Sequence, residues 1–152
     1  MIKYGKVNQE DEKRVRELWK SESVALGIPW KREIVDVLTS GKFHCVRDDG
    51  RLVGFCGTYV LKRKRIVSIV HLVVDKEYRG RGYSKIILRR CYEDAKPLLS
   101  EGYKFQVQAK DGMENNSFYD RISIGYNMEQ KVKSRMRIYD LDSEKISRWN
   151  MD

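Results

Sequence analysis

The chain has 152 residues, a length that suits one domain with a single core. Hydrophobic residues make up 41% and charged residues 35%, which is enough apolar content to fold beneath a heavily charged surface. No segment approaches the roughly 20 apolar residues that a membrane span needs, and the N-terminus lacks the apolar run of a secretory signal. We therefore expect a single domain over residues 1–152 that is cytoplasmic and has no membrane partner.

Cysteine content indicates whether disulfides or a metal site are expected, and net charge indicates which kinds of partner the chain favours. Cys45, Cys56 and Cys91 lie far apart and form no CxxC pair, which argues against a disulfide framework or a zinc site, so we expect buried thiols and no metal. The formal net charge of +9 favours polyanionic partners, namely nucleic acid, phosphorylated ligands or acidic protein surfaces. Charge alone does not choose among them.

The N-terminal part of the chain reads as a strand followed by two helices. The predicted elements are a strand over residues 2–7, a helix over residues 9–20 and a shorter helix over residues 31–39. Asn8 is suited to cap the first helix, and Gly41 is suited to end the second. A break near residues 27–29 separates the two helices.

The middle of the chain is rich in strands. The predicted elements are strands over residues 43–47, 51–61 and 66–74, a turn over residues 48–50 and a basic turn over residues 62–65. The strand over residues 66–74 is almost wholly apolar and β-branched. We therefore expect it to be central in the sheet and covered on both faces.

The C-terminal half begins with a helix that starts near Tyr83 and ends before Gly102. Because this helix connects the strand over residues 66–74 to an alternating strand over residues 103–109, we expect the two strands to be parallel. The remaining predicted elements are a helix over residues 113–121, strands over residues 125–129 and 132–141, and a polar tail. Together the elements predict a mixed α/β fold of the α+β type, with a mostly antiparallel sheet of six to seven strands, one parallel crossover and about four helices.

A glycine-containing loop joins the strand over residues 66–74 to the next helix. A helix N-terminus has unpaired N–H groups and a partial positive charge, and Gly80 and Gly82 let a ligand approach the backbone closely. Arg79 and Arg81 add cationic donors, so the segment predicts an anion cradle. GxxxxGK[ST] is absent, and the third glycine of GxGxxG is replaced by Lys85. An ordinary turn with solvent-facing arginines is the alternative.

The segment HLVVDKEYRGRGYSKIIL, residues 71–88, resembles the core motif of the GNAT acetyltransferases, whose signature is [QR]-x-x-G-x-[GA]. Arg79 and Gly82 match its first and fourth positions, and Ser84 stands where glycine or alanine is usual. The order of elements over nearly the whole chain also resembles the GNAT fold. The resemblance implies that acetyl-CoA binds to Leu72, Val73 and Val74, which would hold the pantetheine arm and the carbonyl, and to Arg79, Gly80, Arg81, Gly82, Tyr83 and Ser84, which would hold the pyrophosphate.

A second segment, which contains Asn115, Asn116 and Tyr119, resembles the Asn…(F/L)-Tyr segment on the family's fourth helix. The resemblance implies that one of the asparagines contacts the cofactor and that Tyr119 is the general acid. A phenol with a pKa near 10 can protonate a departing thiolate. The alternative is a tyrosine that packs its ring on the sheet. The loop after this helix is two residues longer than the family's usual x-x-L-G-F.

The sequence does not identify which residue is the general base. His71 has the right chemistry near neutral pH, but a lone histidine in an apolar strand is more often a satisfied core residue. Glu22, Glu33, Glu114 or a water chain are alternatives, and we read His44 as structural.

The resemblance implies an enzyme, an N-acetyltransferase that transfers an acetyl group from acetyl-CoA to a primary amine by direct attack in a ternary complex. The alternative is a non-catalytic GNAT-like module that binds nucleic acid or an acidic protein through its basic surface, at residues 62–65 and 131–137. Those runs also suit a solvated turn and a strand edge. We expect the acceptor groove near residues 21–32, where Ile28 and Trp30 would contact the acceptor or pack. The acceptor's identity and a homodimer are left open.

Overall fold

The computed structural model describes residues 1–22 and 30–149. The predicted break at residues 27–29 and the predicted contact of Ile28 lie outside the described residues. The chain divides into two compact units. Unit 1 comprises Met1–Gly57 and His71–Cys91, and unit 2 comprises Thr58–Val70 and Tyr92–Asp152.

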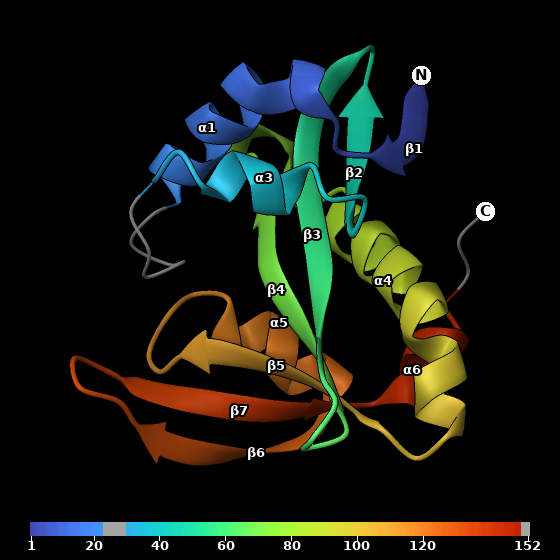
Figure 1. The fold of residues 1–152 in the computed structure, drawn as a ribbon, viewed down its shortest axis with the longest axis vertical. Coiled ribbons are helices and arrows are strands. Elements are labelled where there is room, and N and C mark those ends of the chain that lie inside the picture. The colour runs from blue at the N-terminus through green and yellow to red at the C-terminus, as the bar shows by residue number, and fades with distance from the viewer. Residues whose placement is uncertain (23–29, 150–152) are drawn as a thin grey trace. The chain divides into compact units, whose positions relative to one another are not determined.

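Seven strands form one sheet in the order β1-β2-β3-β4-β5-β7-β6 (Figure 1). The strands are β1 (Ile2–Lys6), β2 (Phe43–Asp48), β3 (Arg51–Leu61), β4 (Ile66–Val74), β5 (Lys104–Lys110), β6 (Ser123–Gln130) and β7 (Arg135–Leu141). β4 and β5 pair in parallel, whereas β1–β2, β2–β3, β5–β7 and β6–β7 are antiparallel. The predicted sheet, mostly antiparallel with one parallel crossover, is thus confirmed.

The described helices are α1 (Glu12–Ser21), α3 (Ile34–Leu38), α4 (Tyr83–Ser100), α5 (Asn116–Ile122) and α6 (Ser143–Ser147), with 3-10 turns η1 (Gln9–Asp11) and η2 (Lys76–Tyr78). The first predicted helix begins in η1, because Asn8 and Asp11 form a capping box, with the Asn8 amide donating to the Asp11 carboxylate at 2.9 Å. In the described residues, no helix is both long and apolar enough to cross a membrane.

Two helices are shorter than the sequence predicts. The predicted helix over residues 31–39 is α3 alone, because Ile34 and Val35 donate to carbonyls three residues back, at 3.0 and 3.2 Å, and so form a tight turn before the helix. The predicted helix over residues 113–121 begins only at Asn116. There the Asn116 side chain accepts the Gly112 amide at 2.8 Å and holds the preceding residues in a loop.

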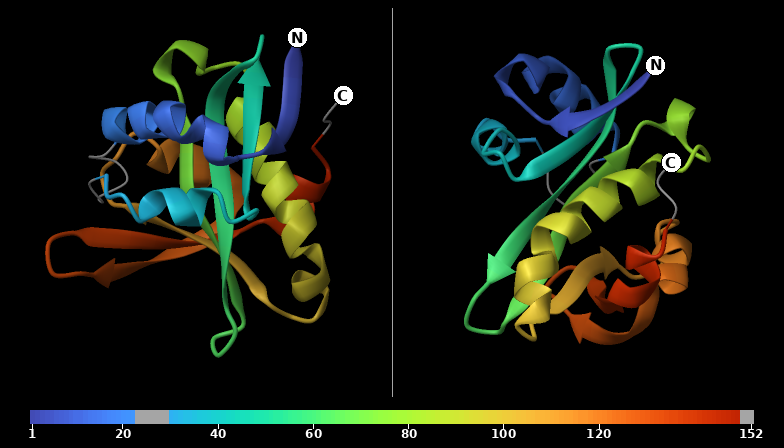
Figure 2. Two further views of the ribbon diagram at one scale, coloured as in Figure 1. Left: turned by 45° about the horizontal axis from the view of Figure 1, so that its top comes forward. Right: turned by 90° about the vertical axis from the view of Figure 1, so that its right-hand side faces the viewer.

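Unit 1 has helices on both faces of its strands. α1 and α3 lie on one face and the first half of α4 on the other (Figure 2). Trp19 of α1 is 1% exposed and Ile87 of α4 is also 1% exposed. At Gly54 in β3, an added Cβ would lie 2.9 Å from Ile87 Cδ1 and 3.0 Å from the Val73 carbonyl oxygen, so this glycine permits the close packing of α4 on the sheet.

The prediction that β4 is central in the sheet is confirmed, and each of its residues is either buried or half-buried. Val67, Ile69 and Val73 are buried, but Leu72 is only half-buried. His71 has a φ of 54°. This left-handed residue lies between the β4 residues that pair with β5 and the buried residues Val73 and Val74.

Unit 2 contains the parallel pair and the C-terminal strands. The β4–β5 ladder has four pairs, from Ile66↔Lys104 to Ile69↔Val107. α4 ends at Ser100, and Gly102, which follows it, has a φ of 95°. The amides of Gly102 and Tyr103 donate back into the last turn of the helix, to the carbonyls of Leu99 and Leu98, which is a Schellman cap.

Candidate functional site

The loop before α4 is shaped by two left-handed glycines. Gly80 has a φ of 79° and Gly82 a φ of 82°, a conformation that costs an L-residue energy and glycine none. A Cβ added at either position would meet no atom within 4 Å. Glycine is therefore favoured here by backbone conformation, and the space beside the loop is open.

The backbone amides of this loop are available as donors. The first hydrogen bond of α4 runs from the Ile86 amide to the Gly82 carbonyl at 3.2 Å. Among the residues that the structure describes, none accepts a hydrogen bond from the amides of residues 80–84. These donors and the dipole of an 18-residue helix favour an anion at this position.

Arg79 is held at the rim of the loop. Its Nη2 donates to Glu22 Oε1 at 2.6 Å and its Nε donates to the Val74 carbonyl at 3.3 Å. The Glu22 side chain is 13% exposed and that of Arg79 is 40% exposed. The guanidinium thus links the C-terminal end of α1 to the end of β4 while it keeps solvent access.

Arg81 and Tyr83 share one carboxylate, that of Asp48 at the end of β2. Tyr83 Oη donates to Asp48 Oδ2 at 2.9 Å, and Arg81 Nη1 lies 3.7 Å from the same oxygen. The Arg81 guanidinium also lies over the Tyr78 ring, 4.9 Å from its centre. Burial and the Asp48 hydrogen bond raise the pKa of Tyr83. Tyr83 therefore anchors the start of α4 through its hydroxyl.

His71 packs against aromatic rings. Its ring centre lies 4.6 Å from that of Trp19 and 6.1 Å from that of Phe43, with which it is stacked at 12°. Burial lowers the pKa of His71, so the imidazole is neutral at pH 7. Trp30 likewise packs edge-on against Trp19, at 6.2 Å. Both residues make the packing contacts that the sequence left as an alternative to a direct role.

The backbone of Leu72, Val73 and Val74 follows the left-handed His71 and leads to the glycine loop. These three residues lie beyond Ile69, the last β4 residue in the parallel ladder. Asp75 then donates its amide to the Val53 carbonyl at 2.8 Å, which fixes the end of β4 to β3. The segment from His71 to the loop is thus one continuous stretch of unit 1.

The second predicted group lies in unit 2. Tyr119 is 4% exposed, with its ring centre 5.6 Å from that of Tyr139 and 5.5 Å from that of Phe118. Asn116 is 6% exposed, and its Nδ2 donates to the Lys110 carbonyl at 3.1 Å. The Asn116 side chain thus stabilises the loop that precedes α5. Asn115 Oδ1 accepts from Asn116 Nδ2 at 3.4 Å.

Sequence reasoning missed the acidic partners of these residues. Glu22 was considered only as a base, and Asp48 only as part of a turn. Glu22 is 57 residues from its partner Arg79, and Asp48 is 35 residues from its partner Tyr83. Local sequence patterns do not predict pairs so far apart in the chain.

The three cysteines are buried and form no disulfide in the described part of the chain. Within residues 1–22 and 30–149, no cluster of three or more His, Cys, Asp or Glu side chains is arranged to hold a metal ion.

The structure thus combines a mixed sheet that has one parallel pair with a crossover helix that begins after a loop of two left-handed glycines. The model of the Acetyltransferase (GNAT) family matches residues 7–123. The chain belongs to this family.

Solved structures share the fold. N-acetylglutamate synthase from Neisseria gonorrhoeae, complexed with coenzyme A and N-acetyl-glutamate, is 15% identical with a TM-score of 0.70; the match covers 93% of this chain and 35% of that one. PaiA N-acetyltransferase from Thermoplasma acidophilum, in complex with coenzyme A, is 17% identical with a TM-score of 0.63, covering 93% and 99%. yncA from Salmonella typhimurium, with its cofactor acetyl-CoA, is 11% identical with a TM-score of 0.71, covering 94% of each chain.

Proposed function

We propose that this protein is an N-acetyltransferase that transfers an acetyl group from acetyl-CoA to a primary amine by direct attack in a ternary complex. The observation that carries the proposal is that the amides of residues 80–84, which include two left-handed glycines at the start of a long helix, donate to no described residue. Family membership and the coenzyme A in the similar structures support the choice of cofactor.

In this proposal the loop binds the pyrophosphate of acetyl-CoA. The amides of residues 80–84 donate to phosphate oxygens, and Arg79 and Arg81 supply charge at the rim. The small side chain of Ser84 lets the backbone come close. Backbone groups of residues 72–74 hold the pantetheine arm and place an N–H donor at the thioester oxygen, where negative charge develops during attack.

The reaction needs one proton acceptor and one proton donor. The amine nitrogen attacks the thioester carbonyl, the C–S bond breaks, the amine loses a proton and the thiolate gains one. Tyr119 is the proposed donor to the thiolate. His71, neutral because burial lowers its pKa, is the proposed acceptor, reached through a water because its ring packs on Trp19 and Phe43. Most of the rate enhancement comes from holding both substrates together.

Two measurements test the proposal. Coenzyme A at 100 times its Kd should stabilise the protein by about 2.7 kcal/mol, seen as a rise in melting temperature that the double variant Arg79→Ala, Gly82→Glu abolishes. A screen of amine classes, from protein N-termini and lysines to small metabolites, should then find an acceptor that releases free thiol from acetyl-CoA. A melting temperature unchanged by millimolar coenzyme A contradicts the proposal.

A second candidate, a non-catalytic polyanion-binding module, is favoured by the β3–β4 turn. Lys62, Arg63 and Lys64 are exposed there, and the charge of Lys64 helps to lower the pKa of Glu129, after the larger effect of Lys131. The Arg65 guanidinium lies over the Tyr103 ring at 5.1 Å, a pairing of cation and aromatic ring that suits nucleic acid. Salt-sensitive RNA or DNA binding, lost in Lys62→Glu with Lys64→Glu and indifferent to coenzyme A, would favour this module.

A further inference from the structure

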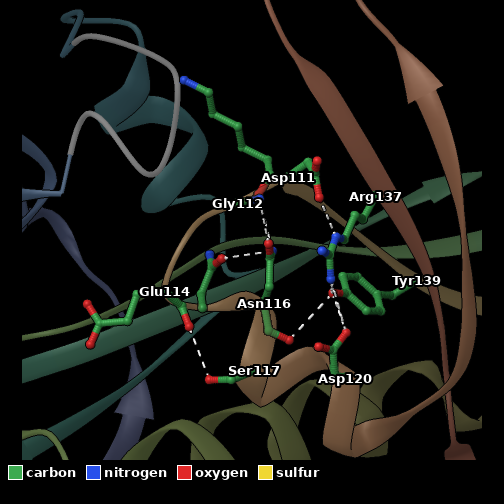
Figure 3. A network of polar contacts seen from close by, with 10 residues as sticks. Asp111, Gly112, Glu114, Asn116, Ser117, Asp120, Arg137 and Tyr139 are labelled. Carbon is green, nitrogen blue, oxygen red and sulfur yellow. Dashed lines mark hydrogen bonds and ion pairs between the residues drawn. The ribbon is translucent and has the colours of Figure 1, made fainter.

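A network of polar side chains connects β7 to α5 in unit 2 (Figure 3). At its centre, Arg137 donates from Nε to Asp111 Oδ1 at 2.6 Å and from Nη1 to Tyr139 Oη at 3.0 Å. Tyr139 Oη in turn donates to Asp120 Oδ1 at 2.7 Å, and Arg137 Nη1 reaches the same oxygen at 3.3 Å. One guanidinium and one phenol thus hold two carboxylates.

Burial makes the Tyr139 hydroxyl a fixed donor. Tyr139 is 0% exposed. Burial and the hydrogen bond to Asp120 raise the pKa of Tyr139 to about 12, and the hydrogen bonds to Tyr139 and Asp111 raise the pKa of Arg137 further above its usual value. Both residues keep their protons at neutral pH, so the polarity of the network is fixed.

The same network secures the first turn of α5. Asn116 binds the Lys110 carbonyl and the Gly112 amide, at 3.1 and 2.8 Å. The Asp111 amide donates to the Arg135 carbonyl of β7 at 2.9 Å. α5 has seven residues, too few to be stable as an isolated helix. Its position therefore depends on these tertiary contacts.

Tyr119 lies between the two anchored residues of α5, three positions after Asn116 and one before Asp120. Its ring rests on the Tyr139 ring, with the centres 5.6 Å apart and the planes at 41°. The side chain that anchors Asp120 by its hydroxyl thus also supports Tyr119 by its ring. A rotation of α5 that moved Tyr119 would break the hydrogen bond between Tyr139 and Asp120.

We propose that Arg137 and Tyr139 are positioning residues for Tyr119, fixing the rotation of α5 through Asp120 and so aiming the Tyr119 hydroxyl at the leaving thiolate. The inference rests on the proposed function, in which Tyr119 is the proton donor. A displacement of about 1 Å can cost a reaction about a hundredfold in rate, so the network acts on kcat.

The test is a double-mutant cycle on Tyr119→Phe and Tyr139→Phe, read as kcat for thiol release from acetyl-CoA with the acceptor that the amine screen identifies. Tyr139→Phe keeps the ring under Tyr119 and removes only the hydroxyl. We expect kcat to fall about ten- to hundredfold, with KM for acetyl-CoA unchanged. In the Tyr119→Phe background, Tyr139→Phe should cause no further loss, since the donor it aims is gone.

Tyr126→Phe is the matched control. Tyr126 makes the same kind of ring contact with Tyr139, at 5.1 Å, and Arg137 lies over its ring, but its hydroxyl donates to no described residue. Its kcat should equal that of the wild type. Asp120→Ala removes the acceptor of the Tyr139 hydrogen bond and replaces Tyr139→Phe if that variant fails to fold; it should give the same loss of kcat.

The outcomes separate the two proposals. If Tyr119→Phe lowers kcat but Tyr139→Phe and Asp120→Ala behave like Tyr126→Phe, the positioning role is wrong and the proposed function stands. Losses that multiply in the double variant assign Tyr139 an independent, structural role and also overturn the inference. If Tyr119→Phe retains full kcat, Tyr119 is not the proton donor of the proposed function. If the wild type releases thiol equally well without an amine, the proposed transfer to an amine is wrong. Either result also overturns this inference.

Discussion

The glycine loop of unit 1 and the polar network of unit 2 differ in the chemical groups that form them, which are backbone amides in the loop and side chains in the network. In the loop, the backbone amides of consecutive residues, 80–84, donate to no described residue. In the network, side chains that are distant in sequence satisfy one another, such as Asp111 with Arg137 and Asp120 with Tyr139. A ligand cradle built from backbone needs only the right residue types in a row. A positioning device built from side chains needs the whole fold.

The largest effect should come from breaking the backbone cradle. Gly82→Glu places a Cβ at a φ of 82° and a negative charge where the pyrophosphate would lie. We expect coenzyme A to bind at least about a hundredfold more weakly, a loss of about 2.8 kcal/mol, measured by isothermal titration calorimetry.

Gly41→Glu is the matched control for this change. Gly41 is also in unit 1, has a φ of 89° and has no atom within 4 Å of an added Cβ. It should therefore carry a similar conformational cost without any effect on coenzyme A. Equal loss of binding in both variants would show that backbone strain, and no specific cradle, explains the result.

The packing that supports the cradle should be the next most sensitive feature. Gly54→Ala places a methyl group 2.9 Å from Ile87 and 3.0 Å from the Val73 carbonyl. We expect it to lower the free energy of unfolding by about 1–3 kcal/mol, measured by denaturant titration. Gly5→Ala in β1 meets nothing within 4 Å and should change stability by less than about 0.5 kcal/mol. Equal effects would mean that α4 is not packed closely on β3.

A smaller effect should come from the acidic partner of the cradle. Glu22→Gln frees Arg79 from an ion pair of 2.6 Å and removes a negative charge that competes with phosphate. Coenzyme A should then bind more tightly, by up to about fivefold, the value of a partly exposed ion pair. Glu17→Gln in α1, the helix that Glu22 follows, should leave the Kd unchanged, because the partner of Glu17 is Arg14. Weaker binding of coenzyme A to Glu22→Gln would show that Glu22 orients Arg79 for the ligand.

The smallest predicted effect is a pH dependence of stability in unit 1. Burial opposes ionisation of Asp11, but the hydrogen bonds from Arg47 and the Asn8 amide outweigh it and lower its pKa below 3.8. Because the folded pKa is below the unfolded one, the stabilisation is complete above pH 3.8 and is lost as the pH falls through the folded value. Asp11→Asn should have a lower melting temperature at pH 7 and a smaller decrease on acidification. An unchanged pH profile would contradict the assignment.

Much of the fold was readable from local sequence patterns. The predicted strands over residues 51–61 and 66–74 match β3 and β4 residue for residue, because β-branched and aromatic residues run between clear turn signals. The left-handed His71 was not predictable, since neither histidine nor its apolar neighbours signal a positive φ. The late start of α5 was missed because it depends on the Asn116 side chain, which local propensity does not describe.

The candidate site divides in the same way. Residues 79–84 were predicted because glycine spacing before a helix has a direct physical meaning. Their role in binding acetyl-CoA stays a prediction, as do the roles of Tyr119 and His71. The side chains that pair with site residues could not be predicted. Glu22 binds Arg79, Asp48 binds Tyr83, and Arg137 binds Tyr139. Each pair is distant in sequence or depends on strand pairing, so only the complete fold brings it together.

The most direct test of the backbone cradle is a titration of the ¹⁵N-labelled protein with coenzyme A, followed by the amide resonances in NMR. The account predicts that the largest shifts occur at the amides of residues 80–84. Shifts concentrated at residues 62–65, or no shifts at millimolar coenzyme A, would contradict it.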